Sequence, residues 1–190
     1  FNFFMQSQFK FCPMCGEGMA MKKSTYEHVE RNTCAKCGYI DYNNSRPTVG
    51  VMILNEKNEI LLVRRAWHPF KGYLDLPGGF IETCEHPEEA ARREIEEELG
   101  IEIKVNSTVF NIETDVYDDG LNEGYVSGRG APVMVLYYLA KITKGEPRVA
   151  EDELAGFDWY PLVDIPKFIS KIAFKSNQKA LMLLYRQKIV

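Results

Sequence analysis

Residues 93–100 have the sequence REIEEELG, which places four glutamates near the end of a helix that Gly100 is expected to terminate. The C-terminal end of a helix carries a partial negative charge, so each carboxylate there is disfavoured by about 0.3–1 kcal/mol. Glutamates three or four residues apart repel one another by about 0.3 kcal/mol more. Because the acidic residues stand where a helix tolerates them least, something must compensate for their charge.

A helical wheel divides this segment into a buried stripe and an acidic arc. The stripe that we expect to be buried consists of Ala91, Ile95 and Leu99. The arc beside it spans about 100° and consists of Glu94, Glu97 and Glu98, whereas Glu96 points to solvent. Three clustered carboxylates suit a hard cation such as Mg²⁺, which prefers oxygen ligands. The alternative is an ordinary solvated acidic face.

The flanking sequence predicts a helix that starts near Pro87, because proline suits the first helical position and Glu88 and Glu89 suit the positive end. The preceding stretch WHPFKGYLDLPGGF, residues 67–80, is rich in proline, glycine and aromatic residues and predicts a loop. Within it, Gly78 and Gly79 permit a tight turn of the backbone.

The rest of this region has the pattern of a mixed α/β domain. PTVGVMIL (47–54) and EILLVRR (59–65) flank the polar turn NEKNE and predict a β-hairpin. Strands are expected at about 101–116, 131–143 and within FDWYPL (157–162). The polar loop at 117–130 is expected to be mobile or to cover substrate, and the tail from 164 to 190 to form one or two amphipathic helices.

Residues 79–101 fit the pattern G-x5-E-x7-R-E-U-x-E-E-x-G-U, in which U is apolar. This pattern resembles the signature of the Nudix hydrolases, and the resemblance extends over about residues 46–175 through LDLPGGFIE and GFDWYPLVDIP. It implies an α/β fold, a Nudix-type α/β/α sandwich with a mixed sheet, as a domain from 46 to 190 that ends in helices.

In that family the loop–helix–loop unit binds Mg²⁺ or Mn²⁺ and hydrolyses a diphosphate linked to another group. The resemblance implies that the catalytic cations are held by Glu94, Glu97 and Glu98, with the carbonyl of Gly79 as a further ligand. It also implies that Arg93 pairs with Glu85 and holds the helix against the loop. Such metals neutralise phosphate oxygens and lower the pKa of bound water.

The general base and the substrate contacts are less closely specified. Of the three acids that precede the last predicted strand, Glu151, Asp152 and Glu153, we prefer Glu153 as the base, and a solvated acidic turn is the alternative. Three further candidates lie near the expected site: Arg64 and Arg65 as phosphate contacts, with one of them a surface charge as the alternative, and Glu82 as an additional carboxylate.

Two C-x-x-C pairs near the N-terminus, Cys12/Cys15 and Cys34/Cys37, are separated by 18 residues. This is the spacing of a four-cysteine zinc ribbon, in which Zn²⁺ supplies the folding free energy that a short segment without a large core lacks. We therefore expect a small structural zinc module at 9–45, and a redox dithiol is the weaker alternative. The fifth cysteine, Cys84, has no predicted role.

The composition is that of a globular chain of 190 residues, with 45% hydrophobic and 26% charged residues. A formal net charge of −4 gives no footprint for nucleic acid, so a nucleic-acid partner is not expected. No apolar run approaches the roughly 18 residues of a membrane span, and no secretory signal is expected at the start. Cysteines spaced for metal indicate a reducing compartment, which we take to be the cytosol.

A zinc ribbon before a Nudix domain resembles the enzymes that act on NADH, ADP-ribose or FAD. The S-Q-P-W element of the NADH-cleaving branch is absent from residues 102–130. Aromatic candidates for stacking on a base are Tyr73, Phe80, Tyr117, Tyr125 and Trp159, each of which is equally explained as a core residue. We predict a pyrophosphatase for a nucleoside diphosphate derivative; the alternatives are a non-catalytic nucleotide sensor and an RNA or cap hydrolase. Homodimerisation is an expectation from the family.

Overall fold

The computed structural model describes residues 9–23, 29–117, 131–150 and 154–189. Contacts between backbone positions divide the chain into two compact units, Phe1–Asn44 and Ser45–Val190. The predicted base Glu153, its neighbours Glu151 and Asp152, the side chain of Tyr117, and Tyr125 with the loop at 118–130 lie outside the described residues.

The N-terminal unit is a three-stranded antiparallel sheet. Its strands β1 (Met19–Lys23), β2 (Glu30–Cys34) and β3 (Ile40–Asp41) pair in the order β1-β2-β3. Cys12, Asn32 and Cys34 are its buried residues among those described. So small an interior stabilises a fold weakly, which agrees with the expectation that metal ligands hold this unit together.

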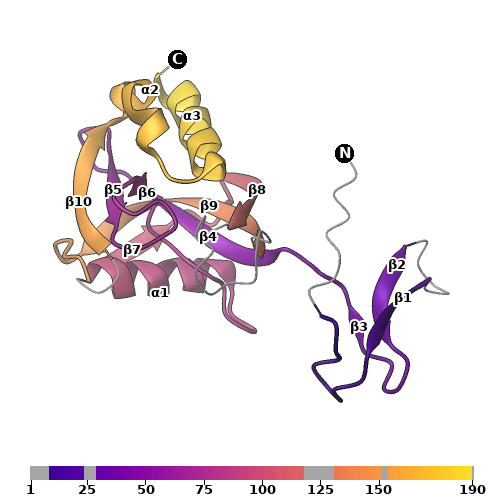
Figure 1. Ribbon diagram of the computed structural model, residues 1–190. Helices are drawn as coiled ribbons and strands as arrows, with labels where there is room; N and C mark the ends of the chain where they lie inside the picture. The colour runs from indigo at the N-terminus through magenta and orange to yellow at the C-terminus, as the bar shows by residue number, and fades with distance from the viewer. Residues whose placement is uncertain (1–8, 24–28, 118–130, 151–153, 190) are drawn as a thin grey trace. The chain divides into compact units, whose positions relative to one another are not determined.

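The second unit has three layers (Figure 1), with helix α1 (Pro87–Leu99) on one face of the strands and helices α2 (Ile165–Phe168) and α3 (Lys175–Ile189) on the other. Short 3₁₀ turns, η1 (Leu162–Asp164) and η2 (Ile169–Lys171), flank α2. The strands are β4 (Arg46–Ile53), β5 (Glu59–Arg65), β6 (Leu74–Asp75), β7 (Glu102–Val105), β8 (Asn111–Tyr117), β9 (Ala131–Lys144) and β10 (Leu154–Pro161). The expected α/β/α sandwich is confirmed.

The sheet is mixed, as expected. β4 pairs in parallel with β9, whose other edge pairs antiparallel with β7 and β8. A second group of strands has the order β10-β5-β6 and is antiparallel throughout. The apolar run at 132–140 lies within β9, which is the central strand of its sheet.

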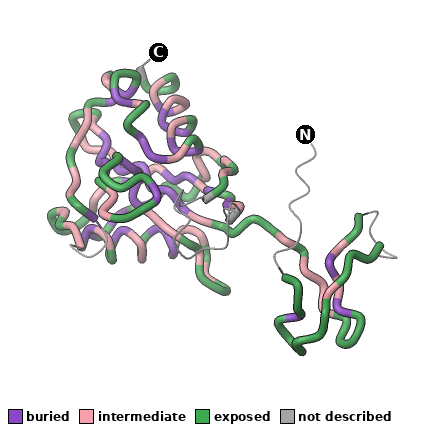
Figure 2. The backbone as a smooth tube through the Cα atoms, viewed as in Figure 1, coloured by how far each residue is buried: buried purple, intermediate pink, exposed green. Residues whose placement is uncertain are grey.

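Alternation along the strands builds two separate cores. Figure 2 marks the buried segments of the backbone in purple. In β5, Leu61 and Val63 join the cluster that contains Ala91, Ile95 and Leu99 of α1, all of which are buried. The intervening Ile60 and Leu62 join the cluster of α3, which includes Leu181 and Leu184. Because successive side chains of a strand point to opposite faces, one strand serves both helical layers.

The predicted hairpin at 47–65 is wrong in one respect. Both strands and the turn between them exist, but β4 and β5 belong to different sheets and meet only at an isolated bridge between Leu54 and Ile60. Each strand instead pairs along its length with a later strand, β4 with β9 and β5 with β10. Sequence proximity favoured the hairpin, and the tertiary pairing with later strands overrode it.

Candidate active site and zinc site

Helix α1 carries the acidic arc, and residues adjacent to it in the sequence cap both of its ends. His86 is the N-cap, its Nδ1 accepting a hydrogen bond from the N–H of Glu88 at 3.3 Å, and Pro87 follows as the first helical residue. Gly100 adopts a left-handed conformation with φ of 64°, and its N–H donates to the carbonyl of Glu96. Glu96 itself is exposed, as the helical wheel predicted.

The loop before α1 contacts two glutamates of the acidic arc, Glu94 and Glu98. The N–H of Gly78 donates to Glu98 Oε2 at 2.9 Å. A Cβ added to Gly79 would lie 2.5 Å from the carboxyl carbon of Glu94. Gly78 also has a positive φ of 136°, which a glycine adopts without strain. The two glycines therefore let the loop backbone approach the carboxylates of Glu94 and Glu98 closely.

Arg93 gathers the remaining carboxylates of this region. Its guanidinium binds Glu85 through two hydrogen bonds, Nε to Oε1 at 2.8 Å and Nη2 to Oε2 at 3.0 Å. Its Nη1 donates to Glu94 Oε1 and to Glu97 Oε2, each at 2.9 Å, and its Nη2 donates to the carbonyl of Phe80 at 3.0 Å. The pairing of Arg93 with Glu85 thus joins the helix to the loop.

This ion pair changes the acidity of both partners. Hydrogen bonds from Arg93 lower the pKa of Glu85 to about 2. The same contacts with Glu85, and weaker ones with Glu94 and Glu97, raise the pKa of Arg93 above its usual value. Both groups are therefore charged at neutral pH, and the pair is fixed in its ionised form.

Arg93 compensates only part of the acidic charge. Three carboxylates, those of Glu85, Glu94 and Glu97, contact one guanidinium, and a fourth, that of Glu98, accepts from the N–H of Gly78. The acidic groups of this region therefore outnumber the cation that pairs with them. The side chain of Glu94 is only 15% exposed, so water screens it less than the 56% exposed side chain of Glu97. Oxygen donors with excess negative charge fit a hard divalent cation.

Among the described residues, the only group of ligand atoms close enough together to hold an ion as placed is the cysteine cluster. The carboxylates of the acidic arc do not form such a group, because they bond to other partners. Glu94 and Glu97 accept hydrogen bonds from Arg93, and Glu98 accepts one from Gly78. The carbonyl of Gly79 already accepts the N–H of Val49 at 2.8 Å and retains a second lone pair.

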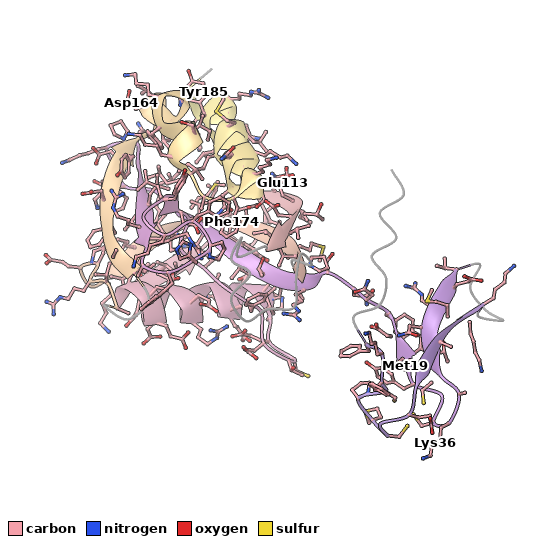
Figure 3. All side chains as sticks on the ribbon, viewed as in Figure 1. Met19, Lys36, Glu113, Asp164, Phe174 and Tyr185 are labelled. Carbon is pink, nitrogen blue, oxygen red and sulfur yellow. The ribbon has the colours of Figure 1, made fainter. Side chains whose placement is uncertain are left out.

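A cleft of about 110 Å³ borders this loop. Gly78, Gly79 and Phe80 form the side next to α1. Its other walls come from β4, β5, β6, β8, β9 and the start of α3. They include the polar residues Thr48, Arg65, Asp75, Asp115, Ser176 and Asn177. Phe174, labelled in Figure 3, also lines it, with its ring centroid 5.1 Å from Cζ of Arg65. The cleft therefore has polar residues on one side and, on the other, the Gly78–Gly79 loop that contacts Glu94 and Glu98.

A buried polar network forms one wall of this cleft. Asp75 accepts from Arg65 Nη1 at 2.8 Å and from Asn177 Nδ2, while Asn177 Oδ1 accepts the hydroxyl of Tyr137 at 2.5 Å. Burial raises the pKa of Asp75, and the neighbouring Arg65 opposes that rise. Burial also raises the pKa of Tyr137. The network connects β5, β6 and β9 to α3 and holds Arg65 in the cleft wall.

The two predicted phosphate contacts lie in different places. Arg65 lines the cleft and donates to the carbonyl of Pro69 at 2.6 Å as well as to Asp75. Arg64 is exposed, donates to the carbonyl of Gly72 at 3.0 Å and lines a separate cavity. Glu82 is exposed, and its N–H donates to Glu85 Oε2 at 2.8 Å.

The described aromatic candidates for stacking on a base also lie in different places. Phe80 is 40% exposed and lines the cleft. Tyr73 is 45% exposed and lines the cavity of Arg64. Trp159 is partly buried and packs against the core under α1, so its role there is structural. Sequence reasoning missed Asp75, Asp115 and Asn177; only Asp75 carried a signal, as a single acid within the apolar stretch before Pro77.

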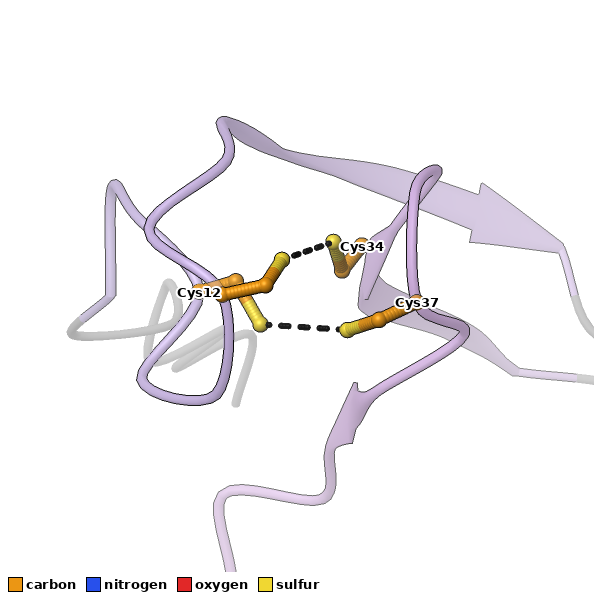
Figure 4. Close-up of side chains that lie close together, drawn as sticks. Cys12, Cys34 and Cys37 are labelled. Carbon is orange, nitrogen blue, oxygen red and sulfur yellow. Dashed lines mark hydrogen bonds between the residues drawn. The ribbon is translucent and has the colours of Figure 1, made fainter.

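The four cysteines of the N-terminal unit converge on one point (Figure 4). The Sγ atoms of Cys12 and Cys37 are 3.5 Å apart, as are those of Cys15 and Cys34, and all four lie within 4.8 Å of one another. A tetrahedral ion with Zn–S bonds of 2.3 Å requires sulfur separations of about 3.8 Å. The backbone N–H of Cys37 lowers the pKa of Cys34 to about 6, whereas a hydrogen bond with Cys12 raises the pKa of Cys37.

Both cysteine pairs are built by the same turn. Gly16 and Gly38 follow them with φ of 73° and 78°, and their N–H groups donate to the carbonyls of Cys12 and Cys34 at 2.9 and 3.1 Å. Neither glycine is replaceable without backbone strain. The repeated geometry confirms the predicted paired knuckles, and the donor set of four sulfurs fits zinc.

Comparison with known families agrees with both sites. Residues 44–182 match the NUDIX domain, and residues 10–43 match the zinc ribbon described as Nudix N-terminal. The chain therefore belongs to the Nudix family, and its N-terminal unit is the zinc ribbon of that family. The resemblance inferred from residues 79–101 is confirmed.

Individual relatives share parts of this arrangement. An ADP-ribose pyrophosphatase of Methanocaldococcus jannaschii is 36% identical over 115 residues, covering 60% of this chain and 62% of that protein. The NAD-capped RNA hydrolase NudC of Klebsiella pneumoniae is 28% identical over 160 residues, covering 83% of this chain and 53% of that protein. The chain thus spans less than two thirds of the length of these curated relatives.

A solved structure covers almost the whole chain. The crystal structure of a Nudix hydrolase from Nitrosomonas europaea superimposes with a TM-score of 0.71 at 25% identity, over 95% of this chain and 92% of that one. No helix among the described residues of the present chain is both long and apolar enough to cross a membrane.

Proposed function

We propose that this protein hydrolyses the pyrophosphate bond of a nucleoside diphosphate linked to another moiety, with a divalent cation bound at α1. The observation that carries the proposal is the contact between the Gly78–Gly79 loop and the carboxylates of Glu94 and Glu98, at the border of a cleft. A diphosphate at that border would meet the cation, and the attached group would enter the cleft.

The residues proposed to hold Mg²⁺ or Mn²⁺ are Glu94, Glu97 and Glu98, with the Gly79 carbonyl as a further ligand. When bound, such a cation neutralises phosphate oxygens and lowers the pKa of water. Arg93 positions Glu94 and Glu97 through its Nη1 group and fixes the loop through Glu85. Glu153 remains our proposal for the group that accepts the proton from water.

Arg65 is the proposed phosphate contact in the cleft wall, because Asp75 and Pro69 fix its guanidinium there. A guanidinium with a fixed orientation recognises phosphate oxygens at a small entropic cost. Glu82 is retained as a carboxylate at the loop, close to Glu85 in the hydrogen-bonded turn. Arg64 has a weaker claim to the substrate because it lines another cavity.

ADP-ribose, FAD and NADH are the candidate substrates. The relatives named as an ADP-ribose pyrophosphatase and an NAD-capped RNA hydrolase both act on a diphosphate that joins an adenosine to another group. Phe80, exposed at the cleft, is the described aromatic residue best placed to stack on a base. The proposed role of the zinc is structural, because all four ligands are cysteines. We keep the cytosol and a homodimer as expectations.

A substrate screen with Mg²⁺ and with Mn²⁺ tests this proposal. Wild-type protein should release a nucleoside monophosphate from at least one of ADP-ribose, FAD, NADH and NAD-capped RNA, detected by chromatography. Glu97→Gln and Glu98→Gln should each lower kcat about a hundredfold or more. Glu96→Gln is the matched control, because Glu96 is on the same helix and faces solvent.

The alternative is a non-catalytic nucleotide sensor. Saturable nucleotide binding without turnover of any diphosphate compound, under conditions in which the zinc module is loaded, would contradict the hydrolase and favour the sensor. Equal loss of activity in Glu96→Gln and Glu97→Gln would contradict the assignment of the acidic arc.

A further inference from the structure

A second cavity, of about 280 Å³, lies between β5, β6, β10 and the segment of α2 and η2. It is lined by Arg64, Gly72, Tyr73, Leu74, Tyr160, Phe168, Ser170 and Lys171. None of these residues lines the cleft beside Gly79. The cavity therefore belongs to a different part of the surface and is not used by the proposed reaction.

The walls of this cavity are fixed to one another by backbone contacts. Arg64 is paired with Leu74 in the β5–β6 ladder, and Ile172 forms a bridge with Leu74 on its other side. The N–H of Ala173 donates to the carbonyl of Leu74 at 2.8 Å, which ties the segment after η2 to β6. Because these walls are already joined, a ligand meets a cavity that is formed in advance.

The lining has the charge that an anion requires. Among the residues that the structure describes, this lining contains two cations, Arg64 and Lys171, and no carboxylate. Arg64 Nη1 donates to the carbonyl of Gly72 at 3.0 Å, which holds the guanidinium at the cavity. Three hydroxyl groups, those of Tyr73, Tyr160 and Ser170, add hydrogen-bonding capacity. Arginine and lysine together are common partners of phosphate groups.

The lining also presents aromatic surface. Tyr160 and Phe168 pack at 5.0 Å between ring centroids, with Phe168 buried. Tyr73 is 45% exposed, and its ring is 5.6 Å from that of Phe70. An exposed ring that is supported by another ring is a surface on which any nucleobase stacks, because every base has a π face.

We propose that this cavity is a second, non-catalytic nucleotide site that binds a nucleoside 5′-monophosphate. The phosphate lies near Arg64 and Lys171, and the base lies against Tyr73. Cleavage of a nucleoside diphosphate derivative releases such a monophosphate, so the source of the ligand rests on the proposed function. The binding itself does not, since the described residues that line the cavity are all different from those that line the cleft.

Calorimetric titration of AMP into the full chain, without added Mg²⁺ or Mn²⁺, tests the proposal. We expect saturable binding, and we expect Lys171→Glu to weaken it about tenfold or more. Lys167→Glu is the matched control: Lys167 is also exposed, carries the same charge and pairs with Asp164 outside the cavity. It should leave AMP affinity within about twofold of wild type.

Two further variants test the remaining parts of the proposal. One distinguishes recognition of the base from recognition of the phosphate, and the other distinguishes the cavity from the catalytic site. Tyr73→Ala should weaken AMP but not inorganic phosphate. Glu97→Gln should lose hydrolysis and retain AMP binding, so that failure of the hydrolase leaves this test intact. Absence of saturable AMP binding, or equal effects of Lys171→Glu and Lys167→Glu, would overturn the proposal.

Discussion

The carboxylate of Glu94 occupies the position where a side chain at residue 79 would begin. A Cβ on Gly79 would lie 2.5 Å from the carboxyl carbon of Glu94. Residue 79 is held in this position because its carbonyl accepts the N–H of Val49. The loop and the helix therefore meet without an intervening methyl group. Glu94 is thereby confined between the loop and Arg93.

Gly79→Ala should displace the Glu94 carboxylate and lower hydrolysis about a hundredfold, while overpacking costs about 1–3 kcal/mol of stability. Activity and urea unfolding measure the two effects. Gly18→Ala is the control, because a Cβ there meets no atom within 4 Å. Full activity of Gly79→Ala would show that this contact does not constrain the site.

Arg93→Lys should lower activity at least tenfold, because lysine cannot make the two parallel hydrogen bonds to Glu85 while also reaching Glu94 and Glu97. We expect a loss of about 1–2 kcal/mol of stability. Arg92→Lys is the matched neighbour, since Arg92 is exposed and pairs with Glu88 on the same helix at 3.1 Å. Indistinguishable variants would refute a special role for Arg93.

The Arg93–Glu85 pair should make stability depend on acid pH. The pKa of Glu85 is lowered from 4.5 to about 2 in the folded protein. Its contribution is therefore complete above about pH 4.5 and is lost as pH falls toward 2. The difference in unfolding free energy between wild type and Glu85→Gln should shrink across that window. A difference independent of pH would show that Glu85 contributes by packing alone.

Removal of zinc should unfold the N-terminal unit, because its few buried residues do not stabilise it alone. Cys12→Ser should cause the same loss, seen as proteolysis within residues 9–44, and should reduce bound zinc measured by atomic absorption. Cys84→Ser is the control, since Cys84 is exposed and lies in the other unit. Resistance of the metal-free unit to protease would contradict a structural zinc.

Several features could be predicted because each depends on neighbours in the sequence. The spacing of Ala91, Ile95 and Leu99 predicted the buried face of α1, and all three are buried. The spacing of the cysteines predicted two similar turns, and each turn closes on a glycine. Both patterns are local. A helix repeats every 3.6 residues, and each cysteine turn closes with a hydrogen bond within five residues, from Cys12 to Gly16 and from Cys34 to Gly38.

The cleft wall could not be predicted in this way. Asp75 and Asn177 bond to each other although they are 102 residues apart, and Tyr137 reaches Asn177 from a third element. Nothing near these residues in the sequence indicates such partners. The pairing of β4 with β9 instead of β5 has the same origin, because strand pairing depends on which distant strand buries its surface.

The sequence by itself determined the acidic helix, its ends and the four sulfur ligands, because short-range backbone geometry sets where those side chains point. Only the tertiary structure decided that Arg65 faces the cleft while Arg64 faces a second cavity. Adjacent residues of a strand point to opposite faces, so what each one meets depends on the layers packed on either side.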